Sequence, residues 1–270
     1  MGTALSANGS TSDWNESLDR LRALIQEIVS MLEGSLRFRA RFVSASELAG
    51  QYYCEKKVEL TRLHGEEGSP EMLFGRQAHV ELLSDTVRTT REELWRRIFA
   101  GEPVAVRELL LAAKHREVPL VGVTDLVVFA RGLPVALFEH KFSRAGLPFN
   151  DYHVQAQVYC YMLQKLGFDI SLLKYILVMV PPECRGREEL VRIPKLVLQN
   201  LDQTFLTMDV PPHKVRMYIY PYAEDKLLRD LEWALDYWKE GRDAKPTTKA
   251  AKCRVCAFRT TCEFSLAKTP

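Results

Sequence analysis

The chain has 270 residues, of which 47% are hydrophobic, so it can bury a substantial core in one large domain or in one domain with appendages. Its formal net charge is only +2, well short of the strongly basic balance that by itself marks a nucleic-acid binder. Any anionic partner must therefore meet local basic patches. The sequence contains no run of about 18 apolar residues and no secretory signal at its start, so we expect a cytoplasmic protein with no membrane partner.

Residues 1–42 form an N-terminal segment with two predicted elements. Apolar residues at helical spacing predict an amphipathic helix over residues 12–33, which could cap the core or contact another copy of the chain. Residues 37–42 alternate arginine with apolar residues, which predicts a half-buried strand with one basic face. That face suits a solvated sheet edge and a phosphate-contacting stripe equally well.

The middle of the chain changes from helical to strand patterns. Residues 44–47 (SASE) fit a capping box that starts a helix running towards Cys54, and residues 72–97 predict further helix. Three apolar runs follow, joined by short connections, and they predict an antiparallel meander. These runs cover residues 103–113, 118–130 and 134–142.

A helix over residues 150–166, stopped by Gly167, and a strand over residues 174–180 complete the central pattern. The sequence therefore predicts an α/β fold in which a mixed central sheet is covered by helices on both faces. Further elements are predicted beyond it, namely strands over residues 191–198 and 215–222 and a helix over residues 223–239.

The run Leu137–Phe142 is typical of a buried strand, yet it carries Glu139 and Lys141. Burying an unpaired charge is costly, so these groups need compensation. If the preceding hairpin turns near Gly132, Asp125 lies opposite Glu139 on the same face. Two carboxylates so placed need a shared proton or a cation between them, and Mg²⁺ or Mn²⁺ suits hard oxygen ligands.

Lys141 shares the face of Glu139 because side chains in a strand alternate with a period of two. From there its ammonium group can orient or help deprotonate an attacking water and neutralise charge on a phosphate. This constellation predicts a site that cuts phosphodiester bonds. A structural ion-pair network is the alternative interpretation.

Three further residues are candidates for the same site. Gln155 and Tyr159 are four residues apart, so they share one face of the helix that follows the charged strand. His79, four residues after Gly75, is a candidate metal ligand through a neutral imidazole nitrogen. Alone, a histidine of this kind is more often an ordinary helix residue.

The C-terminal tail contains Cys253, Cys256 and Cys262 at the spacing of metal ligands, whereas Cys160 and Cys184 are interpreted as structural. A fourth ligand is needed, and four thiolates suit zinc or an iron-sulfur cluster. The tail is also basic, and its cations could line a path for single-stranded DNA or compensate a negative cluster. These cations are Lys245, Lys249, Lys252, Arg254 and Arg259.

The ordered motifs resemble the RecB-like branch of the PD-(D/E)XK nucleases. They are Gly75–His79, Gly122–Asp125, Glu139–Lys141 and Gln155–Tyr159. Together with Cys54, the cysteine tail makes the chain most similar to the CRISPR-associated Cas-four nuclease family. The resemblance covers roughly residues 43–180 and 246–264.

The resemblance implies a restriction-endonuclease-like core over residues 43–240 and an iron-sulfur tail over residues 241–270, closed by Cys54. It implies a 4Fe-4S cluster on Cys54, Cys253, Cys256 and Cys262. It also implies a Mg²⁺ or Mn²⁺ ion on His79, Asp125, Glu139 and the backbone carbonyl of His140. Lys141 would be the catalytic lysine, and Gln155 and Tyr159 would help to position the DNA and the active site.

The implied function is a DNA exonuclease that acts on single-stranded DNA or DNA ends during CRISPR spacer acquisition, with the integrase complex as partner. A repair or recombination nuclease like RecB or AddB is the alternative, and a non-catalytic DNA-binding scaffold is the third hypothesis. Two positions depart from the family pattern. Thr124 stands where the family name expects proline, and Glu55 follows Cys54 where proline is common.

Overall fold

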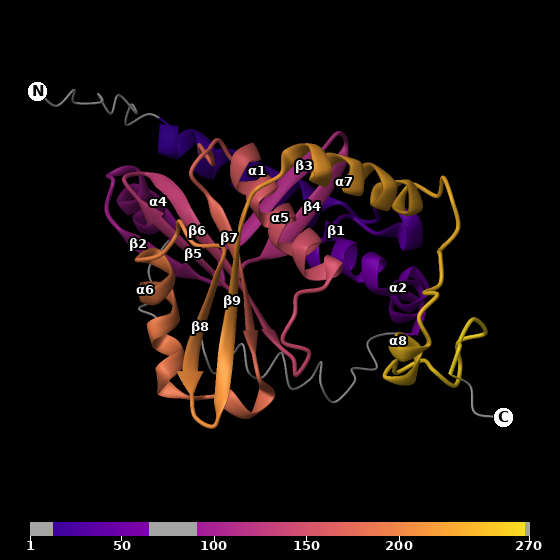
Figure 1. Ribbon diagram of the computed structural model, residues 1–270. Coiled ribbons are helices and arrows are strands. Elements are labelled where there is room, and N and C mark those ends of the chain that lie inside the picture. The colour runs from indigo at the N-terminus through magenta and orange to yellow at the C-terminus, as the bar shows by residue number, and fades with distance from the viewer. Residues whose placement is uncertain (1–12, 65–90, 268–270) are drawn as a thin grey trace, which may run out of the picture.

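The structure is a computed structural model in which residues 13–64 and 91–267 are described. The predictions for Gly75, His79 and the helix over residues 72–90 lie outside the described residues. Within the described part, mixed sheets are flanked by helices, which confirms the predicted α/β fold class (Figure 1).

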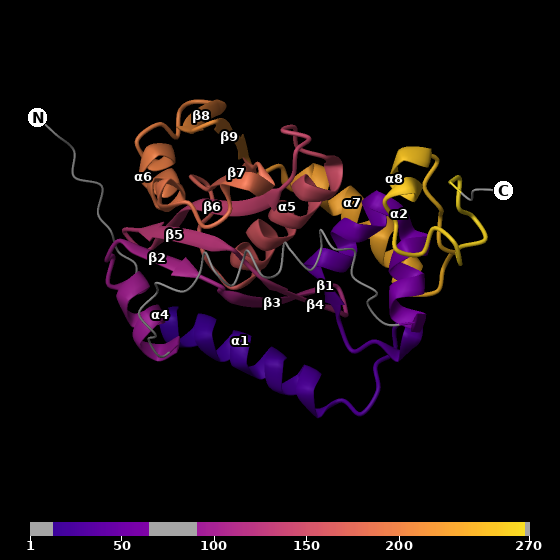
Figure 2. The same cartoon turned by 90° about the horizontal axis from the view of Figure 1, so that it is seen from below.

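The predicted N-terminal helix is present as α1, Asp13–Ser30. Its side chains Leu18 and Leu21 are buried, and the helix packs on α4 (Arg91–Phe99) and β3 (Leu110–His115). Figure 2 shows α1 running along the outer side of the layer that contains β3, so it caps the core. None of the helices in the described ranges is long and apolar enough to cross a lipid bilayer.

The basic strand predicted over residues 37–42 is wrong. The segment instead forms a 3-10 turn, η1 (Arg37–Arg39), whose central residue has a φ of 61°. A strand cannot form there, because this φ belongs to the left-handed region. The guanidinium of Arg37 donates to the carbonyl oxygens of Tyr237 and Arg242 at 2.9 and 2.7 Å. Arg37 therefore fastens this turn to another part of the fold.

The predicted capping box starts α2, which spans Ala45–His64. The Ser44 hydroxyl oxygen accepts a hydrogen bond from the Glu47 N–H at 3.2 Å, and the Glu47 carboxylate accepts one from the Ser44 N–H at 3.0 Å. The helix is interrupted at Cys54, where φ is −171° and ψ is 114°. Cys54 therefore lies in extended backbone between two helical halves.

The described strands belong to two sheets, whereas the sequence predicted one. The smaller sheet has the order β1-β4-β3 and contains Val43–Ser44, Val118–Val123 and β3. The larger sheet is mixed, because β6 and β7 are parallel and the other neighbours are antiparallel. Its order is β2-β5-β6-β7-β9-β8, with bounds Val104–Arg107, Leu126–Ala130, Leu133–Phe142, Lys174–Val180, His213–Pro221 and Phe205–Val210.

The predicted three-strand meander is wrong because its first two runs are each cut in two. The first run breaks at Glu108, which has a φ of 50°, and the second breaks at Thr124 and Asp125. At each break the chain passes from one sheet to the other. Neither break carries a glycine or proline, which are the usual sequence signals of an interrupted strand.

The hairpin of β5 and β6 has the predicted register next to Asp125, where Leu126 faces Phe138. The predicted symmetric turn is not what produces it. The turn residues Arg131 and Gly132 have positive φ values of 54° and 78°, and a bulge in the strands shifts the pairing by one residue. The one-residue shift from the bulge compensates for the asymmetric two-residue turn, so the pairing next to Asp125 is the predicted one.

Helices cover both faces of the larger sheet. Near the predicted positions, α5 (Asn150–Lys165) and α7 (Glu224–Trp238) contribute to the apolar cluster that contains Leu137. On the opposite face, η3 (Glu188–Arg192) and α6 (Ile193–Leu198) contribute to a second cluster (Figure 2). The active-site candidates on β6 that share the face of Leu137 therefore lie under α5.

The strand predicted over residues 191–198 is wrong, because most of this segment is α6. Ile193 and Val197 are four residues apart and both are buried, which is helical spacing. Pro194 occupies the first turn, where a helix tolerates it. The helical spacing of these two buried residues therefore matches the structure of the segment.

Two short elements complete the described fold. The 3-10 helix η2 (Pro182–Cys184) follows β7, and α8 (Ala250–Arg254) lies in the tail. Figures 1 and 2 both show α8 beside α2, so the helix that carries Cys54 and the cysteine tail lie next to each other.

Candidate active site and cysteine pocket

Asp125 lies between β4 and β5, one residue outside the ladder of the larger sheet. Its Oδ2 atom accepts a hydrogen bond from the backbone N–H of His140 at 2.6 Å. Because Leu126 pairs with Phe138, continuing the register by one residue brings Asp125 alongside Glu139. The break between β4 and β5 therefore directs the Asp125 carboxylate at β6.

Glu139 and Lys141 form an ion pair on the face of β6 that α5 covers. The Nζ atom of Lys141 lies 2.7 Å from Oε1 of Glu139, and the two side chains are 21% and 2% exposed. Removing one member of such a buried pair costs more than the pair itself contributes, because the other charge is left behind. The two charges that looked out of place in the strand compensate one another.

Lys141 has two further neighbours, both on α5. Its ammonium donates to Oε1 of Gln155 at 2.7 Å and lies 5.0 Å from the ring centroid of Tyr152. Burial alone lowers the pKa of Lys141, but the carboxylates of Glu139 and Asp125 raise it, and the net pKa lies above the ordinary value. The lysine is therefore a fixed positive charge at neutral pH.

Gln155 and Tyr159 share the face of α5 that meets the active site. The Gln155 amide donates to the Tyr159 hydroxyl oxygen at 3.1 Å, so it links the tyrosine to Lys141. The Tyr159 ring packs against Gly122, where an added Cβ would meet a ring carbon at 2.5 Å. Burial and then the Glu139 carboxylate raise the pKa of Tyr159, so its hydroxyl stays protonated.

The structure thus places the active-site candidates from the described residues together: Asp125, Glu139, Lys141, Gln155 and Tyr159. His140 lies beside them, with Nδ1 3.4 Å from Oδ2 of Asp125. In a strand the N–H and C=O of one residue point to the same edge, so the His140 carbonyl lies on the Asp125 side. His79 lies outside the described residues.

Tyr152 is a site residue that the sequence analysis missed. It precedes Gln155 by three residues, and this helical spacing is the signal that would have found it. Its ring also contacts Phe149, with centroids 5.5 Å apart. Tyr152 therefore connects Lys141 to the loop between β6 and α5.

This arrangement has the parts that phosphodiester hydrolysis needs. Carboxylate and carbonyl oxygens are the donors that Mg²⁺ and Mn²⁺ prefer, and Asp125, Glu139 and His140 supply them. An ammonium fixed beside these oxygens can orient a water molecule and stabilise negative charge on a phosphate. The donor set therefore fits a divalent cation next to Lys141.

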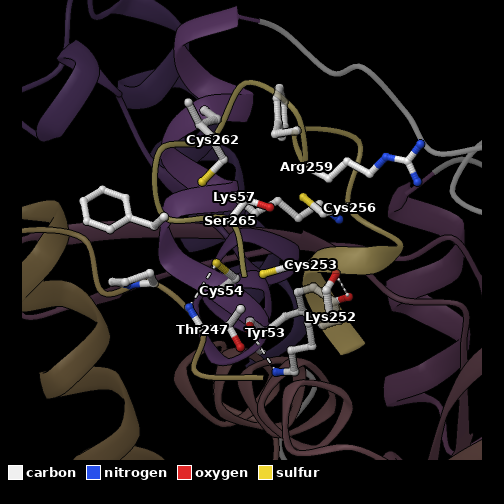
Figure 3. Close-up of a pocket in the computed structure, with 14 residues that line it drawn as sticks. Tyr53, Cys54, Lys57, Thr247, Lys252, Cys253, Cys256, Arg259, Cys262 and Ser265 are labelled. Atoms are coloured by element: carbon white, nitrogen blue, oxygen red, sulfur yellow. Dashed lines mark hydrogen bonds between the residues drawn. The ribbon is translucent and has the colours of Figure 1, made fainter. Parts of the chain in front are cut away.

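Four cysteines line one pocket between α2 and the tail (Figure 3). The residues are Cys54 from the kink of α2 and Cys253, Cys256 and Cys262 from the tail. Lys57, Lys252 and Arg259 line the same pocket, so cations surround the thiols. Cys160 and Cys184 are buried elsewhere in the apolar clusters.

Residues of the tail form hydrogen bonds with the backbone groups that the kink at Cys54 leaves without helical partners. An interrupted helix leaves carbonyl groups without N–H partners, and Lys252 Nζ donates to those of Tyr52 and Tyr53 at 3.2 and 2.8 Å. The Tyr53 hydroxyl donates back to the Lys252 carbonyl oxygen at 3.2 Å, and the Thr247 N–H donates to Cys54 Sγ at 3.4 Å. Lys252 is thus hydrogen-bonded to the main chain of α2.

Glu55 provides a second anchor for the tail and is completely buried. Its carboxylate accepts bonds from both terminal nitrogens of Arg242 at 2.6 and 2.7 Å, and from the Lys245 N–H at 2.8 Å. The position where the family pattern favours proline therefore carries a carboxylate that fixes the tail to α2. Sequence reasoning treated Glu55 only as a departure.

The sequence matches the PD-(D/E)XK nuclease superfamily over residues 19–263. The chain belongs to the PD-(D/E)XK nuclease superfamily. Membership implies a nuclease, which is a hydrolase. No curated protein matches the chain. Among solved structures, the crystal structure of SSO0001 is similar with a TM-score of 0.48 and 16% identity, covering 93% of this chain and 97% of that one.

Proposed function

We propose that this PD-(D/E)XK nuclease is a metal-dependent deoxyribonuclease that cuts single-stranded DNA or DNA ends as an exonuclease. The observation that carries the proposal is the Glu139–Lys141 ion pair beside the Asp125 carboxylate on one partly buried face. Two carboxylates that converge in this way repel each other, and a divalent cation removes the repulsion. A purely structural network has no need of the second acid.

Each residue of the site has a role in this proposal. Asp125, Glu139 and the His140 carbonyl would hold Mg²⁺ or Mn²⁺, with His79 as a further ligand. When bound, the ion polarises the phosphate and makes water a better nucleophile. Lys141 orients that water and stabilises the developing negative charge. Gln155 and Tyr159 hold Lys141 in place through the hydrogen bonds that join them.

The proposal includes an iron-sulfur cluster in the four-cysteine pocket. The resemblance to the family implies that this cluster is 4Fe-4S. Among the described residues, no three His, Cys, Asp or Glu side chains form a group that could hold one metal ion. Cys54, Cys253, Cys256 and Cys262 nevertheless line one pocket. Four thiols suit either an iron-sulfur cluster or a zinc ion, and the resemblance to the iron-sulfur members of the family favours the cluster.

The order of the motifs, together with the cysteine tail, favours a role in CRISPR spacer acquisition with the integrase complex. A repair or recombination nuclease of the RecB or AddB kind is the alternative. Recovery of an integrase with the tagged protein supports the first role, and recovery of helicase or recombination subunits supports the second. A scaffold without cleavage activity would bind DNA and leave it intact.

The test of the nuclease is cleavage of end-labelled single-stranded DNA with Mn²⁺, with Mg²⁺ or with EDTA. We expect the wild type to cut only with a divalent ion, and Asp125→Asn to cut at least about 10²-fold more slowly. Asp169→Asn is the matched control, because Asp169 is an exposed carboxylate that also accepts a backbone N–H, from Ser171 at 2.9 Å.

Two results would contradict the proposal. Cleavage by the wild type in EDTA would show that no divalent ion is required. Equal cleavage by Asp125→Asn and Asp169→Asn would show that the Asp125 carboxylate has no part in the reaction.

A further inference from the structure

A second cavity, of about 380 Å³, lies beside the active site. We call it the β9 groove, and it is bounded by the loop after β6, the end of β7 and the start of β9. The side chains used below are Arg144, Lys214 and Arg216, and the loop also contributes Gly146. Its size is that of a ligand pocket.

The β9 groove is in register with the catalytic lysine. Lys141 on β6 pairs with Met179 on β7, and Met179 pairs with Arg216 on β9. Directly paired residues share a face of the sheet, so Arg216 lies on the same face as Lys141. Two strand spacings separate their backbones by roughly 10 Å. A chain of phosphates that enters the active site can therefore pass over Arg216.

Arg216 is the cation of the groove that is available to a ligand. Arg144 is paired with Glu183 at 2.6 Å, and Lys214 lies 3.5 Å from Asp209. The Arg216 side chain is exposed and makes no hydrogen bond or ion pair with the residues that the structure describes.

The Arg216 guanidinium lies close to Gly146 in the loop after β6. The guanidinium packs against the backbone of this glycine, which has a positive φ of 65°. The Tyr218 hydroxyl donates to the Gly146 carbonyl oxygen at 3.0 Å and holds the loop over β9. The loop leaves room for this guanidinium because Gly146 has no side chain.

Two aromatic rings lie between Lys141 and the loop that bounds the β9 groove. Phe149, in the same loop as Gly146, is 50% exposed and contacts the Tyr152 ring, which in turn lies beneath Lys141. Exposed aromatic rings beside cations are the combination that binds single-stranded nucleic acid, because bases stack on the rings while cations contact phosphates.

We propose that the β9 groove binds the single-stranded DNA next to the bond that is cut, with Arg216 on a neighbouring phosphate and Phe149 stacked on a base. This inference rests on the proposed deoxyribonuclease function and assigns the path of its substrate. It predicts two contributions of different kinds. The Arg216 contribution depends on salt, and the Phe149 contribution does not.

The test is binding of a fluorescein-labelled single-stranded DNA in EDTA, measured by anisotropy over a series of salt concentrations. We expect Arg216→Ala to bind about tenfold more weakly and to reduce the slope of log K against log salt by about 0.7. Arg216→Lys should restore the slope. Phe149→Ala should bind about fivefold more weakly with an unchanged slope. Arg229→Ala, an exposed arginine on α7, is the control and should match the wild type.

The same proteins are then assayed for cleavage with Mn²⁺, so that the two proposals fail separately. If the wild type cuts DNA but Arg216→Ala binds with wild-type affinity and slope, the groove is not the substrate path. If the wild type binds DNA through Arg216 and does not cut it, the groove is a DNA-binding site, but the nuclease proposal is wrong and so is the placement of the groove next to a cut bond. A wild type that neither binds nor cuts single-stranded DNA overturns both.

Discussion

The active site and the cysteine pocket are built in opposite ways. The active-site side chains come from consecutive parts of the chain, namely the connection between β4 and β5, then β6 and α5, and they contact one another directly. The cysteine pocket joins Cys54 to a tail almost two hundred residues later in the chain, and contacts outside the thiols hold the parts together.

The difference shows two ways of keeping chemical groups in place. At the active site the reactive groups are themselves the structural contacts, because Glu139 and Lys141 neutralise each other. At the cysteine pocket the positions are set by Glu55 and Lys252, which bind the tail to α2 and leave the thiols facing the pocket. Substitutions should therefore couple function to stability in different ways at the two places.

Cys256→Ser should have the largest effect at the cysteine pocket. Losing one of four thiolates should abolish cluster binding, so iron content, brown colour and thermal stability should fall together. Iron analysis, visible absorption and thermal unfolding measure these. Cys184→Ser is the control, because Cys184 is a buried thiol outside the pocket, and that variant should keep its iron. A colourless wild type that contains zinc would rule out the iron-sulfur cluster.

Glu55→Gln tests whether the tail is held by contacts outside the thiols. It removes the partner of Arg242 in an ion pair whose side chains are 1% and 15% exposed. We expect the free energy of unfolding to fall by about 3–5 kcal/mol. Chemical denaturation measures it.

The matched control for Glu55→Gln is Glu102→Gln, which breaks an exposed pair with Arg97. Its expected cost is about 0–1 kcal/mol. If the two variants lose equal stability, the buried pair is not the anchor of the tail.

Gly122→Ala should lower the free energy of unfolding by less than Glu55→Gln does, and it should measurably slow DNA cleavage. The added Cβ collides with the Tyr159 ring, which must shift and pull on Gln155 and, through it, on Lys141. We expect a loss of about 1–3 kcal/mol from overpacking. Cleavage should slow with little change in DNA binding. Wild-type cleavage rates would show that the tyrosine does not position the lysine.

The active site was largely predictable because its contacts are local. A strand period of two put Glu139 and Lys141 on one face, and a helix period of about 3.6 put Gln155 and Tyr159 together. The register that aligns Asp125 with this group was predicted for an incomplete reason. A symmetric turn was assumed, whereas a two-residue turn and a bulge produce the same alignment.

The errors came where distant contacts decide the local structure. Residues 37–42 alternate like a strand, but Arg37 is bound by carbonyl groups of residues 237 and 242, far along the chain. The break at Thr124 carries no glycine or proline, so the second sheet could not be foreseen. Glu55 was recognised only as an unusual residue, because its partner Arg242 is distant in sequence.

The most direct test of the central claim is degradation of end-labelled single-stranded DNA by the wild type, Lys141→Ala and Lys114→Ala, with Mn²⁺ or EDTA. Lys114 is the matched control, since its ion pair with Glu27 at 2.8 Å lies at the surface. We predict that the wild type and Lys114→Ala degrade the DNA only with Mn²⁺. Lys141→Ala should bind it but cut at least about 10²-fold more slowly. If Lys141→Ala cuts as fast as the wild type, or if all three bind DNA and none cuts it, the account of the active site is wrong.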